Sequence, residues 1–352
     1  MNKVEMFVNG TIYTGWVSVR ISRSISAVAG SFELVVANNW TSKKKGWIIS
    51  PLDECVIKID GEPVITGYVD KISSSFDGSS RSITISGRDK TADLVDCSYV
   101  GPASLDRITL FTLIQTVIKP FGLTFMTEVL LGTKVEDFKA QQGETAFAFL
   151  ERIMRLRGLL LSSDVHGNLV VSQIGLKRAS SAIHEGFNAL SCSFDLDATN
   201  RFSEYIVKGQ SAGSEEWEPQ QTNEVQEKYT DPEVKRYRPT IIVAEGSVDP
   251  SLAGDRAEWE GINRAAKSSS LKVKIRGWKK EDGALWVPNE IVNFESEYFG
   301  FKLDLLISAI TYSQSSDGGT ESELTLERKD AYQKVNSKIP SKSRDIWKEL
   351  SP

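Results

Sequence analysis

The sequence has few of the residues that build metal, redox and disulfide chemistry. Three cysteines and two histidines occur among 352 residues. The cysteines are separated, odd in number and form no CxxC pair, which argues against a disulfide framework and fits synthesis in a reducing compartment. His166 and His184 have no Cys or His at ligand spacing. We therefore expect no metal site and no cofactor.

Targeting and nucleotide-binding signals are also missing. Residues 1–10 have no basic segment followed by an apolar one, and no apolar run reaches membrane-spanning length. The chain contains neither a Walker A string nor GxGxxG. With 42 basic and 47 acidic residues the net charge is -5, which provides no broad basic surface for nucleic acid. We expect no secretory signal, no stable membrane insertion and no sequence-specific nucleic-acid partner.

Two patterns raise the question of catalysis. Residues 209–213 spell GxSxG around Ser211, but a hydrolase elbow needs a later histidine, and none follows His184. A glycosidase needs two converging carboxylates, for which the candidates include Glu144, Glu151, Asp164 and Glu185. Spacing alone does not show that any of them converge, so we predict that the protein is not an enzyme. The alternative is a cell-wall glycan-binding or muralytic protein that uses residues 99–175.

A β-hairpin pattern occurs twice. Residues 67–97 hold two β-rich arms around an Asp77-Gly78 turn. Residues 310–330 repeat this pattern, with Asp317-Gly318 as the turn, and residues 83–89 then align with residues 324–330. This match predicts two related β modules, although hairpins in general share such turns and alternation.

Helical patterns lie between and within these modules. Apolar residues from Ile108 to Ile118 recur at helical spacing behind Asp106, a candidate N-cap, and residues 146–157 give a second amphipathic helix ending at Gly158. Asp249-Pro250 is an N-cap and N1 pair that opens a helix over 249–267. Residues 210–238 have few apolar side chains and indicate a long polar excursion.

Six segments in order carry a family resemblance: VNGTIYTGWVSVRISRSISAVAGSFEL (8–34), ITGYVDKISSSFDGSSRSITISGRDKTADLVDCS (65–98), PFGL (120–123), GETAFAFLERI (143–153), GDRAEWEGINRAAKSSSLKVKIRGW (254–278) and LWVPN (285–289). Together they resemble the baseplate hub protein (tail protein P family) of Mu-like contractile-tailed bacteriophages. The resemblance covers nearly the whole chain.

The resemblance implies a mainly β fold with α+β: two related β-barrel domains flank an inserted small α/β module. The expected divisions are 1–98 for the first barrel, 99–178 for the α+β module and 179–332 for the second barrel, which carries the excursion at 210–238 and the helix at 249–267. Residues 333–352 are expected to form a C-terminal arm. The implied assembly is a homotrimeric ring that adapts the six-fold tail tube to the three-fold membrane-piercing spike.

The implied role is structural, in tail assembly and viral genome ejection. The expected partners are the central spike protein and the tail tube or other baseplate proteins, and the expected location is the baseplate of the virion tail, after assembly in the host cytoplasm. An infectious phage, a prophage and a tailocin are equally compatible with the sequence. Interfaces of obligate oligomers are centred on buried aromatics, and the residues chosen on this ground, with the basic cluster beside them, are Trp40, Lys43, Lys44, Lys45, Trp47, Trp217 and Trp286. For Trp259 and Trp278 a core position is favoured.

Overall fold

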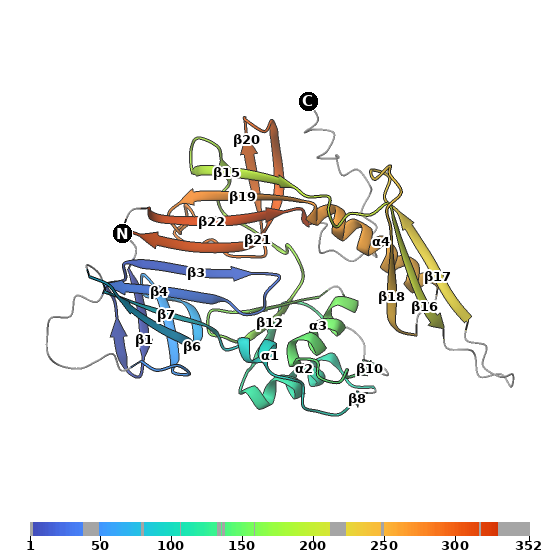
Figure 1. The fold of residues 1–352 in the computed structure, drawn as a ribbon, viewed down its shortest axis with the longest axis horizontal. Coiled ribbons are helices and arrows are strands. Elements are labelled where there is room, and N and C mark those ends of the chain that lie inside the picture. The colour runs from blue at the N-terminus through green and yellow to red at the C-terminus, as the bar shows by residue number, and fades with distance from the viewer. Residues whose placement is uncertain are drawn as a thin grey trace.

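The computed structural model describes residues 3–37, 49–78, 81–105, 107–131, 135, 138–157, 159–211, 223–247, 250–316 and 318–329. These residues form a mainly β structure with a small helical region attached to one side (Figure 1). No helix in these ranges is both long enough and apolar enough to cross a membrane.

The first β module alternates apolar and polar residues along its strands, as a sheet with one buried face requires. In β4, Phe32 and Leu34 are buried while Glu33 between them is exposed. Asn9 and Gly10 have φ values of 50° and 74°, which close the tight turn after the first strand. The strands are β1 (Val4–Val8), β2 (Thr11–Tyr13), β3 (Ser18–Ser24), β4 (Ser31–Ala37), β5 (Glu54–Ile59), β6 (Glu62–Phe76) and β7 (Arg81–Asp89).

The α+β module follows β7 and has its own apolar core, in which Leu113, Ile114 and Leu150 are fully buried. The helix predicted behind Asp106 begins later, because Thr109 is its N-cap and accepts a hydrogen bond from the Thr112 N–H at 3.1 Å. Asp106 lies outside the described residues. The elements are α1 (Ala92–Asp96), β8 (Ser104–Leu105), α2 (Leu110–Ile118), the 3-10 helix η1 (Lys119–Phe121), β9 (Phe125–Thr127), β10 (Phe138–Lys139), α3 (Ala146–Leu156), β11 (Leu160–Ser163) and β12 (Leu169–Ser172).

The second β module resumes after β12. It consists of β13 (Lys177–Arg178), β14 (Ile183–His184), β15 (Ala189–Leu196), β19 (Ser269–Arg276), β20 (Glu290–Ser296), β21 (Phe301–Ser315) and β22 (Gly319–Glu327). Between β15 and β19 lies an inserted unit made of β16 (Glu204–Ser211), β17 (Asn223–Thr230), β18 (Pro239–Ser247) and α4 (Pro250–Lys267).

The inserted unit corrects the prediction of an irregular excursion over 210–238, because β17 falls within it. Val225 of β17 is buried while Glu224 and Gln226 on either side are exposed, so the strand alternates with very few apolar residues. It pairs with β16 over its full length. The core of the unit includes Ala253 and Ala257 of α4, both fully buried.

The two β modules share one sheet. Its strand order is β15-β19-β22-β21-β3-β4-β7-β6-β5-β1-β2, and the strands of the first module (blue) continue into those of the second (orange to red) in Figure 1. The described strands close no barrel, contrary to the sequence-based expectation of two barrels. The first half of β21 pairs with β20, and its second half pairs with β3 of the other module instead of closing its own.

The two modules repeat one strand order. In the first module it is β5-β6-β7-β4-β3, and in the second it is β20-β21-β22-β19-β15. The long strands β6 and β21 have 15 residues each, and the hairpin partners β7 and β22 have 9 each. Both hairpins contain a β-bulge, at Val69/Lys71 and at Ile307/Ala309. The repeat seen in the sequence is therefore also a repeat of topology.

Candidate functional site

The histidine and serine residues considered for metal binding or catalysis are not arranged as a catalytic site in the structure. In the described part of the chain, no group of three His, Cys, Asp or Glu side chains is placed to hold a metal ion. The His184 Nδ1 atom lies 3.5 Å from a carboxylate oxygen of Glu295 on the neighbouring strand. Ser211 is the last residue of β16 and pairs with Asn223 of β17. This Ser is therefore part of a strand pair, which is not the strand-to-helix turn of a nucleophile elbow.

Three of the four candidate carboxylates hold local structure together. Glu144 accepts hydrogen bonds from Arg152 Nε and Nη2 at 3.0 and 2.9 Å and from the Gln141 N–H at 2.6 Å, which fixes the start of α3. Asp164 accepts the His166 N–H at 2.8 Å in a turn. The Ser296 hydroxyl and the Tyr298 N–H donate to Glu185 and lower its pKa. A lowered pKa is the opposite of what a general acid needs.

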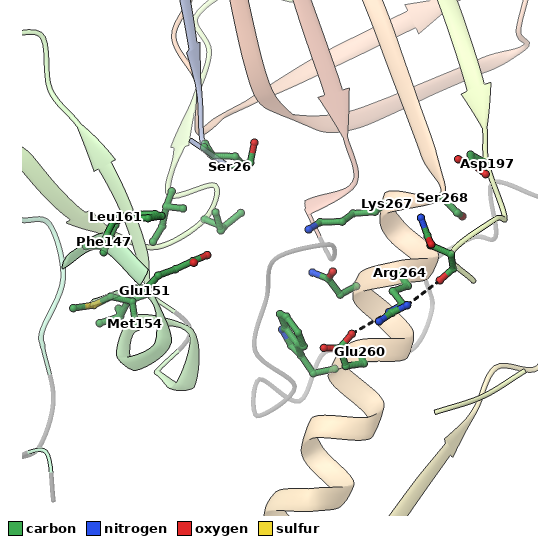
Figure 2. Close-up of a pocket in the computed structure, with 17 residues that line it drawn as sticks. Ser26, Phe147, Glu151, Met154, Leu161, Asp197, Glu260, Arg264, Lys267 and Ser268 are labelled. Carbon is green, nitrogen blue, oxygen red and sulfur yellow. Dashed lines mark hydrogen bonds and ion pairs between the residues drawn. The ribbon is translucent and has the colours of Figure 1, made fainter. Parts of the chain in front are cut away.

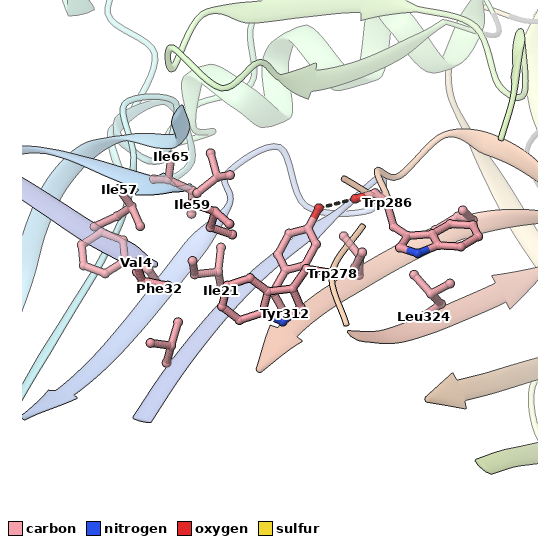
Figure 3. Packing of buried hydrophobic residues seen from close by; sticks show 14 of the residues in the cluster. Val4, Ile21, Phe32, Ile57, Ile59, Ile65, Trp278, Trp286, Tyr312 and Leu324 are labelled. Carbon is pink, nitrogen blue, oxygen red and sulfur yellow. Dashed lines mark hydrogen bonds between the residues drawn. The ribbon is translucent and has the colours of Figure 1, made fainter. Parts of the chain in front are cut away.

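Most residues predicted at an interface, namely Trp40, Lys43, Lys44, Lys45, Trp47 and Trp217, lie outside the described residues. Trp286 is described and belongs to the core of the subunit, where it is 2% exposed and its carbonyl oxygen accepts the Tyr312 hydroxyl (Figure 3). Its side chain therefore presents almost no surface to a partner. Trp278 is also buried, and its indole N–H donates to the Ser313 and Glu321 carbonyls at 3.1 and 2.9 Å.

Trp259 lines a cleft of about 570 Å³ between the α+β module and the inserted unit. Figure 2 shows α3 on one side, with Phe147, Glu151 and Met154, and α4 on the other, with Lys267 among its residues. Arg264 forms an ion pair with Glu260 at 3.1 Å within α4. The cleft thus lies between two parts of the chain that have separate apolar cores, and acidic, basic and apolar side chains all line it.

The two β modules are joined by the junction of β3 with β21. Residues 309–315 pair antiparallel with residues 18–24. On one face Tyr312 lies opposite Ile21, and these side chains are 1% and 0% exposed. On the other face the Ser22 and Thr311 hydroxyls are 3.0 Å apart. The junction therefore has an apolar side and a polar side.

That apolar side belongs to a core shared by the two modules. Trp278 and Tyr312 of the second module contact each other at a ring-centroid distance of 6.0 Å. Ile21 and Phe32 of the first module belong to the same cluster of buried residues (Figure 3). The β3–β21 junction thus combines strand pairing with apolar burial, as stable interfaces between chains do.

Comparison with known proteins identifies the family. A model of the Mu phage baseplate assembly protein GpP-like N-terminal domain matches residues 3–89. A model of the second domain of baseplate hub protein gp44-like proteins matches residues 91–173, and one of the fourth domain of GpP matches residues 249–335. The chain is 35% identical over 344 residues to the baseplate hub protein gp44 of Escherichia phage Mu, covering 94% of this chain and 89% of that protein. The chain belongs to the family of Mu-like baseplate hub proteins.

Solved structures agree with this assignment. The 43 kDa tail protein of prophage MuSo2 from Shewanella oneidensis superimposes with a TM-score of 0.84 at 33% identity, covering 94% of the hub chain and 99% of that protein. The tail protein of Neisseria meningitidis MC58 shares the fold, with a TM-score of 0.82 at 22% identity and coverage of 94% and 98%. The hub chain thus has a structural role in a phage tail baseplate.

Proposed function

We propose that three copies of the hub chain form a ring that adapts the six-fold tail tube to the three-fold spike. The observation that carries this proposal is the repeated strand order of the two modules, which join edge to edge through β3 and β21. A ring of three such chains contains six similar modules, while its true symmetry is three-fold. It therefore offers near six-fold symmetry to one partner and three-fold symmetry to another.

The polar face of the shared sheet supports an opening in this ring. On this face Thr311 and Ser313 of β21 lie beside Ser22 and Arg20 of β3. Further along, Lys274 lies opposite Glu323 and Arg276 opposite Glu321. Lys272 on the same face lies opposite the neutral Thr325, but each of the other two cations of β19 faces a Glu, which offsets most of the positive charge. A surface of low net positive charge binds DNA phosphates weakly. Such a lining lets a genome pass during ejection without holding it.

The other face of the sheet is apolar and belongs to the subunit's own core. The polar face is therefore the one that lines the opening in this proposal. The proposed role is mechanical and non-enzymatic, because Glu144, Asp164 and Ser211 serve a helix start, a turn and a strand end.

The ring is tested by measuring the absolute mass of the purified chain by light scattering at several concentrations, alone and with its spike protein. We expect a trimer whose mass is independent of concentration and a complex containing three hub chains and one spike trimer. A monomer at every concentration, both alone and with the spike, would refute the ring.

A further inference from the structure

The shared sheet has two open strand edges at equivalent places in the repeat. Among the described strands, β15 pairs only with β19, and it holds the place in the second module that β3 holds in the first. The long strand β6 pairs with β5 through Tyr68, and its remaining residues, through Phe76, pair with β7 alone in the described structure. The equivalent half of β21 is covered by β3.

The register of the repeat gives the residues that correspond. The sequence match aligns residues 83–85 of β7 with residues 324–326 of β22. Their pairing partners on the long strands β6 and β21 then align as well. Ser74, opposite Ile83, then corresponds to Ile310, opposite Leu324, and two residues further on Phe76 corresponds to Tyr312.

The same register also relates the edge strands β3 and β15. Ile85 lies opposite Leu34, as Leu326 lies opposite Leu271. Leu34 faces Val19 and Leu271 faces Phe194, so Val19 corresponds to Phe194. Two residues further on, Ile21 corresponds to Leu196.

Burial differs sharply between the closed junction and the open edges. Tyr312 and Ile21 lie opposite each other and are 1% and 0% exposed. Their equivalents Phe76 and Leu196 are 83% and 44% exposed. An apolar side chain on an open strand edge is a liability for a free monomer, and it is expected where another strand adds.

From this we infer that β15 of one copy adds antiparallel to the open half of β6 in the next copy, so that Phe76 packs against Leu196 and Phe194 of its neighbour. The inference rests on the proposed ring and names its subunit contact. The occupant is a second copy of this chain, because each open edge has its complement on the same molecule and the β3–β21 junction shows the pairing already made. A contact between two different edges is head to tail, and such contacts form a ring when the rotation between copies closes.

The test is disulfide cross-linking at the predicted contact. Residues directly opposite in antiparallel strands have Cα atoms about 4.5–5.5 Å apart, within the range that a disulfide spans. We would introduce Phe76→Cys and Leu196→Cys together in a chain carrying Cys97→Ser and Cys192→Ser, since Cys97 is exposed and Cys192 partly exposed. Mild oxidation is expected to give covalent dimers and trimers on a non-reducing gel. Each single variant, and Tyr237→Cys combined with Leu196→Cys, should give none.

A second measurement uses charge. Phe76→Arg should weaken self-association roughly tenfold or more, because it places a cation in the centre of the contact. Tyr237→Arg is the matched control, since Tyr237 is 88% exposed and lies outside the contact, and it should leave association unchanged. A trimer that neither cross-links through residues 76 and 196 nor weakens with Phe76→Arg would overturn this contact and leave the proposed ring intact. A chain that is monomeric throughout would overturn both.

Discussion

Asp89 is the residue whose replacement tests most directly how the α+β module is attached to the sheet. It ends β7, is 1% exposed, and accepts the Gly30 N–H at 2.6 Å and the Thr91 N–H at 3.0 Å. It also accepts the hydroxyl of Ser163 from β11 at 2.6 Å. One carboxylate therefore connects the turn before β4, the start of α1 and a strand of the next module.

The cost of Asp89→Ala follows from the donors that it leaves behind. Two buried backbone N–H groups, of Gly30 and Thr91, lose their acceptor, and each unsatisfied group costs about 1–3 kcal/mol. The Thr91 hydroxyl adds little to this cost, because it lies 3.3 Å from the Val28 carbonyl and can donate there instead. We expect a loss of about 3 kcal/mol in the free energy of unfolding. Asp89→Asn should cost about half as much, because the remaining amide oxygen can serve only one of the two N–H groups.

The assay combines urea unfolding with native-state hydrogen exchange. A loss of about 3 kcal/mol corresponds to roughly a hundredfold faster exchange at the Gly30 and Thr91 amides. The Val207 amide, in the inserted unit, should be unaffected. Glu62→Ala on β6 is the matched control, since Glu62 is exposed and should change stability by less than about 0.5 kcal/mol. If Asp89→Ala unfolded at the same urea concentration as Glu62→Ala, with unchanged exchange, the attachment described here would be refuted.

The Asp89 carboxyl also makes the free energy of unfolding depend on pH, in a direction that its pKa fixes. Burial raises the pKa of Asp89 above its ordinary value, against the opposing effect of its hydrogen bonds. The folded state therefore binds this proton more tightly than the unfolded state, in which the pKa is about 3.9. The resulting stability is complete below that unfolded pKa and is lost as pH rises through the folded pKa. In urea unfolding, the wild type should therefore exceed Asp89→Asn in free energy of unfolding by more at acidic pH than at neutral pH. A larger difference at neutral pH would contradict this prediction.

Two further predictions concern the second module and its insertion. Gly254→Ala in α4 should raise the free energy of unfolding by about 0.5–1 kcal/mol, since an added Cβ meets nothing within 4 Å. On the same helix Gly261→Ala should destabilise, because its Cβ would lie 2.4 Å from the Tyr229 ring, and thermal melts of the two variants should move in opposite directions. Glu290→Gln should cost about 3–5 kcal/mol in urea unfolding, because it removes the counter-charge of the buried Lys280 ammonium, 2.9 Å away. Replacing both partners with Met should restore most of that stability, and no recovery would argue against the ion pair as the cause.

Local features of the fold could be predicted from the sequence because their signals are local. The Asp-Gly turn and the alternation around it predicted the hairpin of β6 and β7, and Asp249-Pro250 predicted the start of α4 at Pro250. β17 was missed because Val225 and Tyr229 are its only apolar residues, too few to give a strand signal. The strand is held by its pairing with β16. The start of α2 was misplaced because Asp106 and Thr109 are both good N-cap residues, and only the fold selects between them.

The candidate interface was harder to predict, for two physical reasons. A tryptophan has the same character in a core and at an interface, and Trp286 proved to be 2% exposed within its own subunit. The β3–β21 junction joins residues such as Ser22 and Thr311, which are 289 positions apart, and no local pattern encodes such a pairing. The repeat bears on the proposed contact between copies, because equivalent strands of two modules are expected to have equivalent neighbours. Phe76 and Leu196 follow from it only once the strand order of both modules is known.

In the proposed ring, the insertions would give a repeated frame its three-fold character. The α+β module follows β7, and the unit of β16, β17, β18 and α4 lies between β15 and β19, so both insertions leave the sheet at strand ends and do not interrupt its pairing. In the proposed ring, a feature shared by both modules recurs six times and a feature of one module recurs three times. The sheet frame is therefore suited to the six-fold tube, and the two inserted units, which differ from each other in fold, are suited to the three-fold spike. Deleting both insertions should therefore weaken binding of the spike more than it weakens the strand contacts that close the ring.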